Sequence, residues 1–446
     1  MRPGQVSTRA ELSAYVRERK LSQTCPLNAL SGTRLGIDAA HYIKTLLSEP
    51  DSREPLVAAT GGIPLALVAR IEADLRSLES LRIRPVFVFA GLPASVRPPQ
   101  KGMDPLAARE TNIKDEAWMH YENGEVDRAI MTLTQIRGGA WTDWRDLVRS
   151  ILRIFRHRFV EYLVAPYFEF AQVSSDALAA ISLAALYRAI RFEADDQLAY
   201  LLKHPKGYIN AIYSGNESLL FPIDRVITHI DWSGLTAFTF LDKSRLLADL
   251  SFSSDQFLDM AILAGSGLCK TFPPFANDFG LKTIIDLVRQ YKSGIAVCQT
   301  WRQDNTVKAV SYVDTFMRTR LAVKYSLVLT TEGACVPLPL VLQPMPPITP
   351  ADVPADFDEI FSQRLPDELY YHLCKGLISS QVLGWLSSGM IVETQPLADS
   401  PDYRRFIKDV ITEGHTAPRC TTLALLTDAL HPQWKQKRVV RRHTPG

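Results

Sequence analysis

Short apolar runs alternate with stretches of helical periodicity along the larger, N-terminal part of the chain. Leu35–Asp38 predicts a strand, followed by a helix through Leu47. Residues 61–81 repeat their apolar positions on one helical face, and the run Pro85–Phe89 predicts the next strand. This alternation is typical of an α/β fold with a mainly parallel sheet flanked by helices.

The same pattern continues downstream. Residues 105–157 are predicted to be mostly helical, and further strands are predicted within VEYLVAP (160–166), YINAIYSG (208–215) and DRVITH (224–229). In parallel sheets, functional sites lie beyond the carboxyl ends of the strands. Acidic residues that directly follow strands are therefore the first candidates for chemistry.

A proline-rich segment, residues 337–354, is predicted to form a stiff, extended linker. Beyond it, residues 355–430 predict a smaller, mostly helical module. The basic tail at 431–446 is predicted to be disordered, and it ends without a folded closing element, so we expect the chain to be truncated. Residues 291–336 are interpreted as an extension of the first domain.

The composition is that of a folded protein of the cell interior. Of the 446 residues, 46% are hydrophobic and 22% charged, which supports a packed core. A net charge of +2 is too balanced to identify a nucleic-acid-binding protein. The six cysteines form no CxxC pair, and the chain has neither a signal peptide nor an apolar run of membrane-spanning length. We therefore expect a soluble, cytoplasmic protein without membrane contact.

Five segments in order resemble motifs of the XPG/flap-endonuclease (PIN-like) superfamily, over roughly residues 1–290. They are LGIDAAHYIKTLL, PVFVFAGLP, VEYLVAP with EADDQLAYL, AIYSGNESLLF and FLDMAILAGSGLC. The resemblance implies a nuclease-type sheet whose strand ends carry acids. In an active two-metal nuclease, such acids hold two Mg²⁺ ions that clamp the scissile phosphate.

Several positions that should carry these acids lack a carboxylate. Asp38 matches the first acid, Glu193 and Asp195 match the internal pair, and Glu217 stands at the second position of the paired-aspartate loop. The degenerate positions are Ala90, Gly215 and Gly267. The resemblance therefore implies a depleted nuclease site with a residual metal-binding set.

Each retained acid also has a structural interpretation. Asp38 precedes a helix and could serve as its N-cap, as a metal ligand, or as both. Glu193 and Asp195 open a predicted helix, where acids favour the positive end of the helix dipole without any metal. Glu217 begins a helical turn and is equally compatible with a structural role.

The sequence gives less evidence for nucleic-acid contact than for the acidic site. Lys101 and Arg109 stand near the positions of the family's phosphate-contacting residues, but they are also compatible with ordinary solvated charges. The segment at 269–288 contains two prolines and lacks the glycine spacing of the family's duplex-binding hairpin. Weak RNA or DNA contact remains an open expectation.

The internal acidic motif is interrupted by an apolar segment. Phe168–Glu169 recurs as Phe192–Glu193, and deletion of 168–191 would restore a superfamily-like VAPYFEADDQLAYL. The segment is either a genuine insertion or a gene-model artefact. If it is genuine and APYFEFAQ is the true motif, Phe168 and Phe170 replace the acidic pair.

The C-terminal segment LPDELYYHLCKGLISSQVLGWLSSGMIVETQPLADSPDYRRFI narrows the resemblance to the fungal maintenance-of-killer-toxin (MKT) family. Members combine an XPG-like domain with such a module. The resemblance implies post-transcriptional regulation of mRNA in the cytoplasm, together with an ataxin-2-like protein that binds poly(A)-binding protein. Tyr370, Tyr371, Leu373, Leu377, Leu383 and Trp385 have the spacing of a helical core, or of a partner groove where they are exposed.

Two function classes follow from this sequence. The preferred one is a non-catalytic, pseudo-nuclease scaffold that needs no cofactor and acts through a protein partner and mRNA–protein complexes. The alternative is a structure-specific, flap-type endonuclease that depends on Mg²⁺ and works with a reduced carboxylate set. Ala90, Gly215 and Gly267 favour the scaffold, whereas the retained acids keep the nuclease open.

Overall fold

The computed structural model describes much of the chain outside several segments and both termini. The described residues are 8–48, 54–59, 64–92, 105–134, 144–167, 194–232, 234, 236–265, 269–275, 280–343, 348–354, 357–361, 365–380, 382–383, 390–393, 405 and 440–443. The predicted insertion at 168–191 lies outside them, as do Lys101, Glu193, Gly267 and Trp385.

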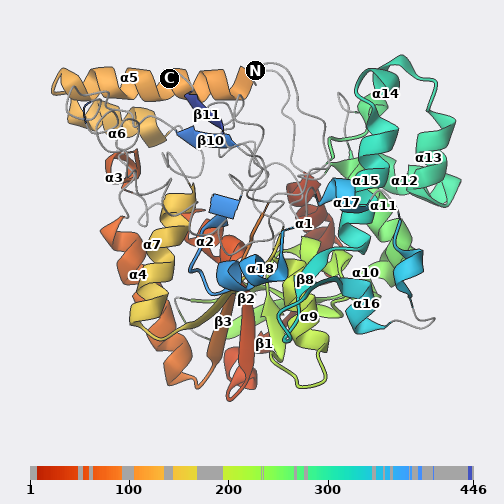
Figure 1. Cartoon of the computed structure of the whole chain (residues 1–446), viewed down its shortest axis with the longest axis horizontal. Coiled ribbons are helices and arrows are strands. Elements are labelled where there is room, and N and C mark those ends of the chain that lie inside the picture. Colours follow the sequence, from red (N-terminus) through yellow and green to blue (C-terminus); the bar gives the residue numbers. More distant parts are fainter. Residues whose placement is uncertain are drawn as a thin grey trace.

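A seven-stranded sheet forms the centre of the molecule, with the strand order β1-β7-β6-β5-β2-β3-β4 (Figure 1). Its strands are β1 (Gln23–Pro26), β2 (Arg34–Asp38), β3 (Arg84–Phe89), β4 (Glu161–Val164), β5 (Ala211–Tyr213), β6 (Arg225–Ile230) and β7 (Ala237–Asp242). The five strands from β6 to β4 in this order run parallel. The prediction of a mainly parallel α/β sheet is therefore confirmed.

Two strands were not expected from the sequence. Strand β7 pairs antiparallel with β6, and β1 pairs antiparallel with β7 at the sheet edge. Strand β1 is only four residues long, QTCP, with little apolar or β-branched character and a proline at its end. Its local sequence therefore gives no strand signal, and its pairing depends on the neighbouring strand.

Helices pack on both faces of the sheet and extend beyond it. Those of the first 250 residues are α1 (Thr8–Glu18), α2 (Ala39–Ser48), α3 (Pro55–Ala59), α4 (Leu65–Ser80), α5 (Pro105–Glu122), α6 (Val126–Thr134), α7 (Trp144–His157), α9 (Asp195–Lys203) and α10 (Lys243–Leu250). They are followed by α11 (Ser254–Ala264), α12 (Leu281–Tyr291), α13 (Gly294–Thr300), α14 (Asn305–Ala309) and α15 (Tyr312–Lys324). Short 3₁₀ turns cover Leu27–Leu30, Asn216–Leu220, Pro273–Phe275 and Pro350–Asp352.

The segment before the second module differs from the predicted extended linker. A hairpin of β8 (Leu327–Leu329) and β9 (Cys335–Pro337) leads into helix α16 (Leu338–Leu342). Prolines suit the first turn of a helix, because the missing N–H would have no helical partner there. The Gln197 side chain of α9 bonds both the N–H and the carbonyl of Leu329, at 2.9 and 3.0 Å. This segment is therefore packed on the first domain.

The described elements after this segment are α17 (Phe357–Ile360), α18 (Asp367–Cys374), β10 (Met390–Glu393) and β11 (Val440–His443). Strand β11 lies within the tail that was predicted to be disordered, but it pairs in parallel with β10. Backbone pairing to β10 orders these four residues despite their charge. Within the described ranges, no helix combines the length and apolar character that a membrane crossing requires.

Candidate functional site at the carboxyl edge of the sheet

Asp38 ends β2 at the carboxyl edge of the sheet, where the sequence placed it. It pairs in register with Val88 of β3, and its side chain is only 2% exposed. One carboxylate oxygen accepts the N–H of Ala40 at 3.0 Å, in the first turn of α2. Asp38 therefore acts as a local cap for α2 and also faces the candidate site.

A serine that the sequence did not single out links two of the acids. The Ser214 hydroxyl, directly after β5, lies 2.7 Å from Asp195 Oδ1 and 3.3 Å from Asp38 Oδ2. A hydroxyl has one hydrogen to donate, so both contacts can be hydrogen bonds only if one carboxyl group carries a proton. The geometry therefore favours a proton on one of the two aspartates, which donates to the Ser214 oxygen while the Ser214 hydroxyl donates to the other.

Glu217 belongs to the 3₁₀ turn that follows β5, and it is 4% exposed. Its carboxylate lies in the space that a side chain on Gly215 would need, because a Cβ atom on Gly215 would overlap it. Gly215 is the degenerate first position of the paired-aspartate loop. In this arrangement one glutamate fills the space of the missing aspartate, so the loop supplies a single carboxylate.

Lys44 is a second residue that the sequence did not single out. It lies on α2, six positions after Asp38, and is only 5% exposed. Its positive charge acts on Asp38 and opposes the rise of that carboxyl's pKa. A lysine is rarely buried unless it is paired, so we assign Lys44 as an internal counter-charge for these acids.

Burial controls the ionisation of these acids. Burial, with a smaller contribution from the Glu217 charge, raises the pKa of Asp38 to about 6, against the effects of Lys44 and the Ala40 N–H. Burial also raises the pKa of Asp195 well above its usual value, and the charge of Asp38 adds to this. Burial likewise raises the pKa of Asp196 well above its usual value. Protonated acids are thus favoured here.

The described residues do not fit a magnesium ion. Mg²⁺ needs several carboxylate oxygens and waters in octahedral geometry. Here the Ser214 hydroxyl lies between Asp38 and Asp195, and the Lys44 ammonium would repel a divalent cation. Within the part of the chain that the structure describes, no group of three or more Asp, Glu, His and Cys side chains is arranged to hold an ion.

The structure describes only some of the other predicted site residues. Ala90 follows β3 and is half-buried at the same edge. Arg109 lies within α5, and nothing further is described of its side chain. Glu193, Gly267 and Lys101 lie outside the described residues. The structure therefore brings together Asp38, Asp195 and Glu217, with Ser214 and Lys44 added.

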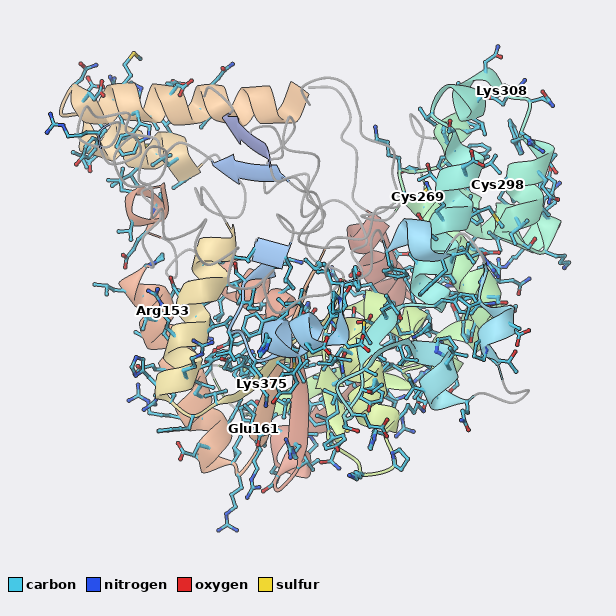
Figure 2. The ribbon with its side chains drawn as sticks, viewed as in Figure 1. Arg153, Glu161, Cys269, Cys298, Lys308 and Lys375 are labelled. Atoms are coloured by element: carbon cyan, nitrogen blue, oxygen red, sulfur yellow. The ribbon has the colours of Figure 1, made fainter. Side chains whose placement is uncertain are left out.

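The second module contacts edge strand β4 near both of its ends. The Tyr167 hydroxyl, just beyond β4, donates to the Phe361 carbonyl at 3.0 Å and contacts the Tyr370 hydroxyl of α18. Arg156 of α7 bonds the Gly376 carbonyl, and Tyr162 of β4 bonds the Lys375 carbonyl at 3.3 Å. Figure 1 shows α18 in front of the sheet, and Figure 2 labels Lys375 near Glu161 of β4. The module thus covers edge strand β4.

The helical-core prediction for this module holds for part of the residue set. Tyr370, Leu373 and Leu383 are buried, with exposures of 3% or less. Tyr371 and Leu377 are 47% and 67% exposed. These two side chains are therefore surface residues of the module.

Comparisons with known proteins agree with this organisation. A family model for the XPG N-terminal domain matches residues 11–102. A second, MKT1_N, described as "Temperature dependent protein affecting M2 dsRNA replication", matches residues 354–443. The sheet order, the strand-end acids and the first match together define an XPG-like α/β protein.

The sequence also aligns with named relatives over most of its length. "Post-transcriptional regulator MKT1" of Cryptococcus neoformans var. grubii is 56% identical over 429 residues, which are 96% of this chain and 52% of that protein. "Post-transcriptional regulator mkt1" of Schizosaccharomyces pombe is 26% identical over 420 residues, covering 85% of this chain and 48% of that protein. The chain belongs to the MKT family, and it spans about half the length of these relatives.

Among solved structures, flap endonuclease-1 from Methanococcus jannaschii superposes with a TM-score of 0.41 and 16% identity, covering 68% of this chain and 81% of that chain. The fold class rests on the sheet order and the XPG N-terminal match rather than on this superposition.

Proposed function

We propose that this chain is a non-catalytic XPG-like scaffold that acts in the post-transcriptional regulation of mRNA through a protein partner. The names of the Cryptococcus and Schizosaccharomyces relatives, both post-transcriptional regulators, support the regulatory role. The observation that carries the non-catalytic part is the buried Lys44 beside Asp38. The Lys44 ammonium supplies a positive charge to the Asp38 carboxyl, which in a nuclease a metal ion would supply.

The neighbouring contacts support the same proposal. Asp38 and Asp195 are bonded to Ser214, and Glu217 fills the space beside Gly215. These acids already have partners within the protein. A divalent cation would have to displace the Ser214 contacts and approach a like charge in a buried setting, where such repulsion is large. No resident cofactor is part of the proposal.

The partner part of the proposal uses the contact between the two segments. Because α18 packs against the β4 edge through Tyr167 and Tyr370, one continuous surface spans the XPG-like domain and the module. We propose that the partner is an ataxin-2-like protein that binds poly(A)-binding protein, within cytoplasmic mRNA–protein complexes. The resemblance to the MKT family supports this choice.

The alternative function is a flap-type endonuclease that depends on Mg²⁺. The convergence of Asp38, Asp195 and Glu217 from separate strand ends favours it, because three carboxylates at one edge are the start of a metal site. The ammonium of Lys44 stands against it. The two functions differ in whether Asp38 is needed for phosphodiester cleavage.

A cleavage assay separates the two. The purified chain is incubated with a labelled 5′-flap DNA in Mg²⁺ and in Mn²⁺, next to Asp38→Asn. The scaffold predicts an intact substrate for both proteins. When tethered to a reporter mRNA, both should change reporter protein output equally. Cleavage by the wild type that Asp38→Asn abolishes would establish the endonuclease instead.

A further inference from the structure

Helices α4 and α7 end with the same capping geometry at the opposite, amino edge of the sheet. In α7, the Val160 N–H donates to the Phe155 carbonyl at 3.0 Å, and the Phe159 N–H donates to the Arg156 carbonyl at 3.3 Å. In α4 the same pair of bonds surrounds Arg82. Phe159 and Arg82 have left-handed φ values of 53° and 58°. Glycine is the usual residue at this capping position, so both side chains are held there against a backbone preference.

The ring of Phe159 lies in solvent. The residue is 94% exposed, which makes it the most exposed large hydrophobic residue among those that the structure describes. An aromatic side chain in the left-handed region is a conformational outlier for a bulky residue. A fully exposed ring at a strained position contributes little to packing, so a binding role is the more economical explanation.

Three arginines lie at the same edge of the sheet as Phe159. Arg84 begins β3, and the register that pairs Val86 with Glu161 brings Arg84 and Phe159 to the same edge of the sheet. Arg82 and Arg158 flank them in sequence, and all three arginines are exposed. None of them forms an ion pair with another described residue.

Acidic neighbours do not cancel this charge. Glu161 is ion-paired with Arg34, the register partner of Arg84. Glu79, in the last turn of α4, is exposed and has no ion pair with a described arginine. Three unpaired guanidinium groups therefore remain beside one exposed ring. In Figure 2, Glu161 marks the β4 side of this edge.

We propose that Arg82, Arg84, Arg158 and Phe159, the amino-edge surface, bind single-stranded RNA. A base stacks on the Phe159 ring, and the guanidinium groups contact the flanking phosphates. Aromatic platforms beside basic grooves bind single strands in this way, because every base offers a π-face. The choice of RNA rests on the proposed function in mRNA regulation. The surface is separate from the acids at the carboxyl edge.

The test uses a labelled uridine-rich 15-mer RNA and fluorescence anisotropy at about 50 mM NaCl, with EDTA present. Phe159→Gly is the main variant, because glycine suits the capping position and the fold is retained. Its binding should be about 5- to 100-fold weaker than that of the wild type. Arg84→Gln should reduce the slope of log affinity against log salt by about 0.7.

Matched controls come from other helix ends of the chain. Ser251 ends α10 and Lys20 follows α1 with the same pair of bonds and left-handed φ values of 57° and 51°. Ser251→Gly controls for the backbone change, and Lys20→Gly controls for loss of a positive charge elsewhere. Both should bind RNA as the wild type does.

Three results would overturn the proposal: no saturable RNA binding by the wild type, unchanged binding by Phe159→Gly, or equal competition by poly-glutamate. The last would make the surface a general anion or acidic-protein site. Because EDTA excludes metal-dependent cleavage, these failures are distinct from failure of the scaffold proposal, which the flap assay tests. A chain that regulates a tethered reporter but binds no RNA would refute only this inference.

Discussion

The two edges of one sheet carry opposite chemistry. At the carboxyl edge, Asp38 and Asp195 are buried, share the Ser214 hydroxyl and lie near the buried Lys44. At the amino edge, the arginines and Phe159 of the amino-edge surface are exposed. Parallel topology produces this polarity, because helices begin near one edge and end near the other. Acids favour helix starts and cations favour helix ends.

The two edges differ in whether their charged side chains are accessible to solvent. The carboxyl edge has the residue types of a nuclease, but these acids are buried, and Asp195 Oδ2 has no hydrogen-bond partner among the described residues. At the amino edge, the charges of the amino-edge surface face solvent. Under the two proposals, the acids at the carboxyl edge serve as a structural centre and ligand binding uses another surface of the same fold.

The largest effect is expected from Lys44→Met. Removing one partner from a buried charged cluster leaves the other charge uncompensated, so the free energy of unfolding should fall by about 3–5 kcal/mol. Urea denaturation followed by circular dichroism measures this. Lys20→Met, at an exposed lysine, should change it by less than about 0.5 kcal/mol. If the free energy of unfolding falls no more for Lys44→Met than for the Lys20→Met control, Lys44 is not an internal counter-charge.

The second-largest effect is expected in the pH dependence of stability, to which Asp38 contributes. The pKa of Asp38 is raised to about 6 in the fold, above the usual unfolded value. The folded state therefore binds more protons, and stability falls as pH rises from about 4 to about 6. This loss is about 2–3 kcal/mol for a shift of about 2 units.

Asp38→Asn should lose this contribution. Unfolding free energies at pH 4.5 and pH 7 would be compared between the wild type and Asp38→Asn. Groups outside this acid cluster titrate equally in both proteins, so the difference reports on Asp38 together with Asp195, whose pKa the Asp38 charge raises. Parallel pH profiles for the two proteins would show that the Asp38 carboxyl has an ordinary pKa.

A smaller effect is expected from Tyr370→Phe. This change removes the hydroxyl that contacts Tyr167 and accepts the Leu365 N–H at 3.2 Å. Leaving buried polar groups unsatisfied should cost about 1–3 kcal/mol. Tyr371→Phe, at the exposed neighbour, is the matched control and should be near neutral. Equal unfolding free energies for both variants would contradict the docking of the module through Tyr370.

The smallest effect is expected from Phe159→Gly. Relief of the left-handed conformation favours glycine, whereas its greater freedom in the unfolded chain opposes it. Stability should therefore stay unchanged or rise by up to about 1 kcal/mol. A drop of more than about 1 kcal/mol would show that the Phe159 ring packs in the fold and is not a free platform. Thermal unfolding next to Ser251→Gly measures this.

The sequence predicted the parallel strands because β2 and β3 are nearly continuous apolar runs, which is typical of strands buried on both faces. The resemblance to the XPG/flap-endonuclease superfamily implied that Asp38, Asp195 and Glu217 lie at one edge. The sequence pattern missed β1, whose QTCP segment pairs only because β7 is beside it. It also described 337–354 as extended, although Leu338–Leu342 forms a helix on the first domain.

Lys44 and Ser214 could not be found in the same way. A single lysine in YIKTLL gives no sign that it is buried, apart from apolar neighbours on both sides. A serine after a strand is common in loops. The exposure of Phe159 is equally hidden, since RHRFVEYL combines a helix end with a strand start. These features depend on tertiary contacts, which no local pattern contains.

The central claim is that the Lys44 ammonium takes the place of metal at the carboxyl edge. Calorimetric titration of Mg²⁺ into the purified wild-type protein tests it most directly, with Asp38→Asn as the matched control. The account predicts no saturable heat for either protein. Stoichiometric binding by the wild type that disappears in Asp38→Asn would contradict it, and would mean that the retained carboxylates still form a metal site.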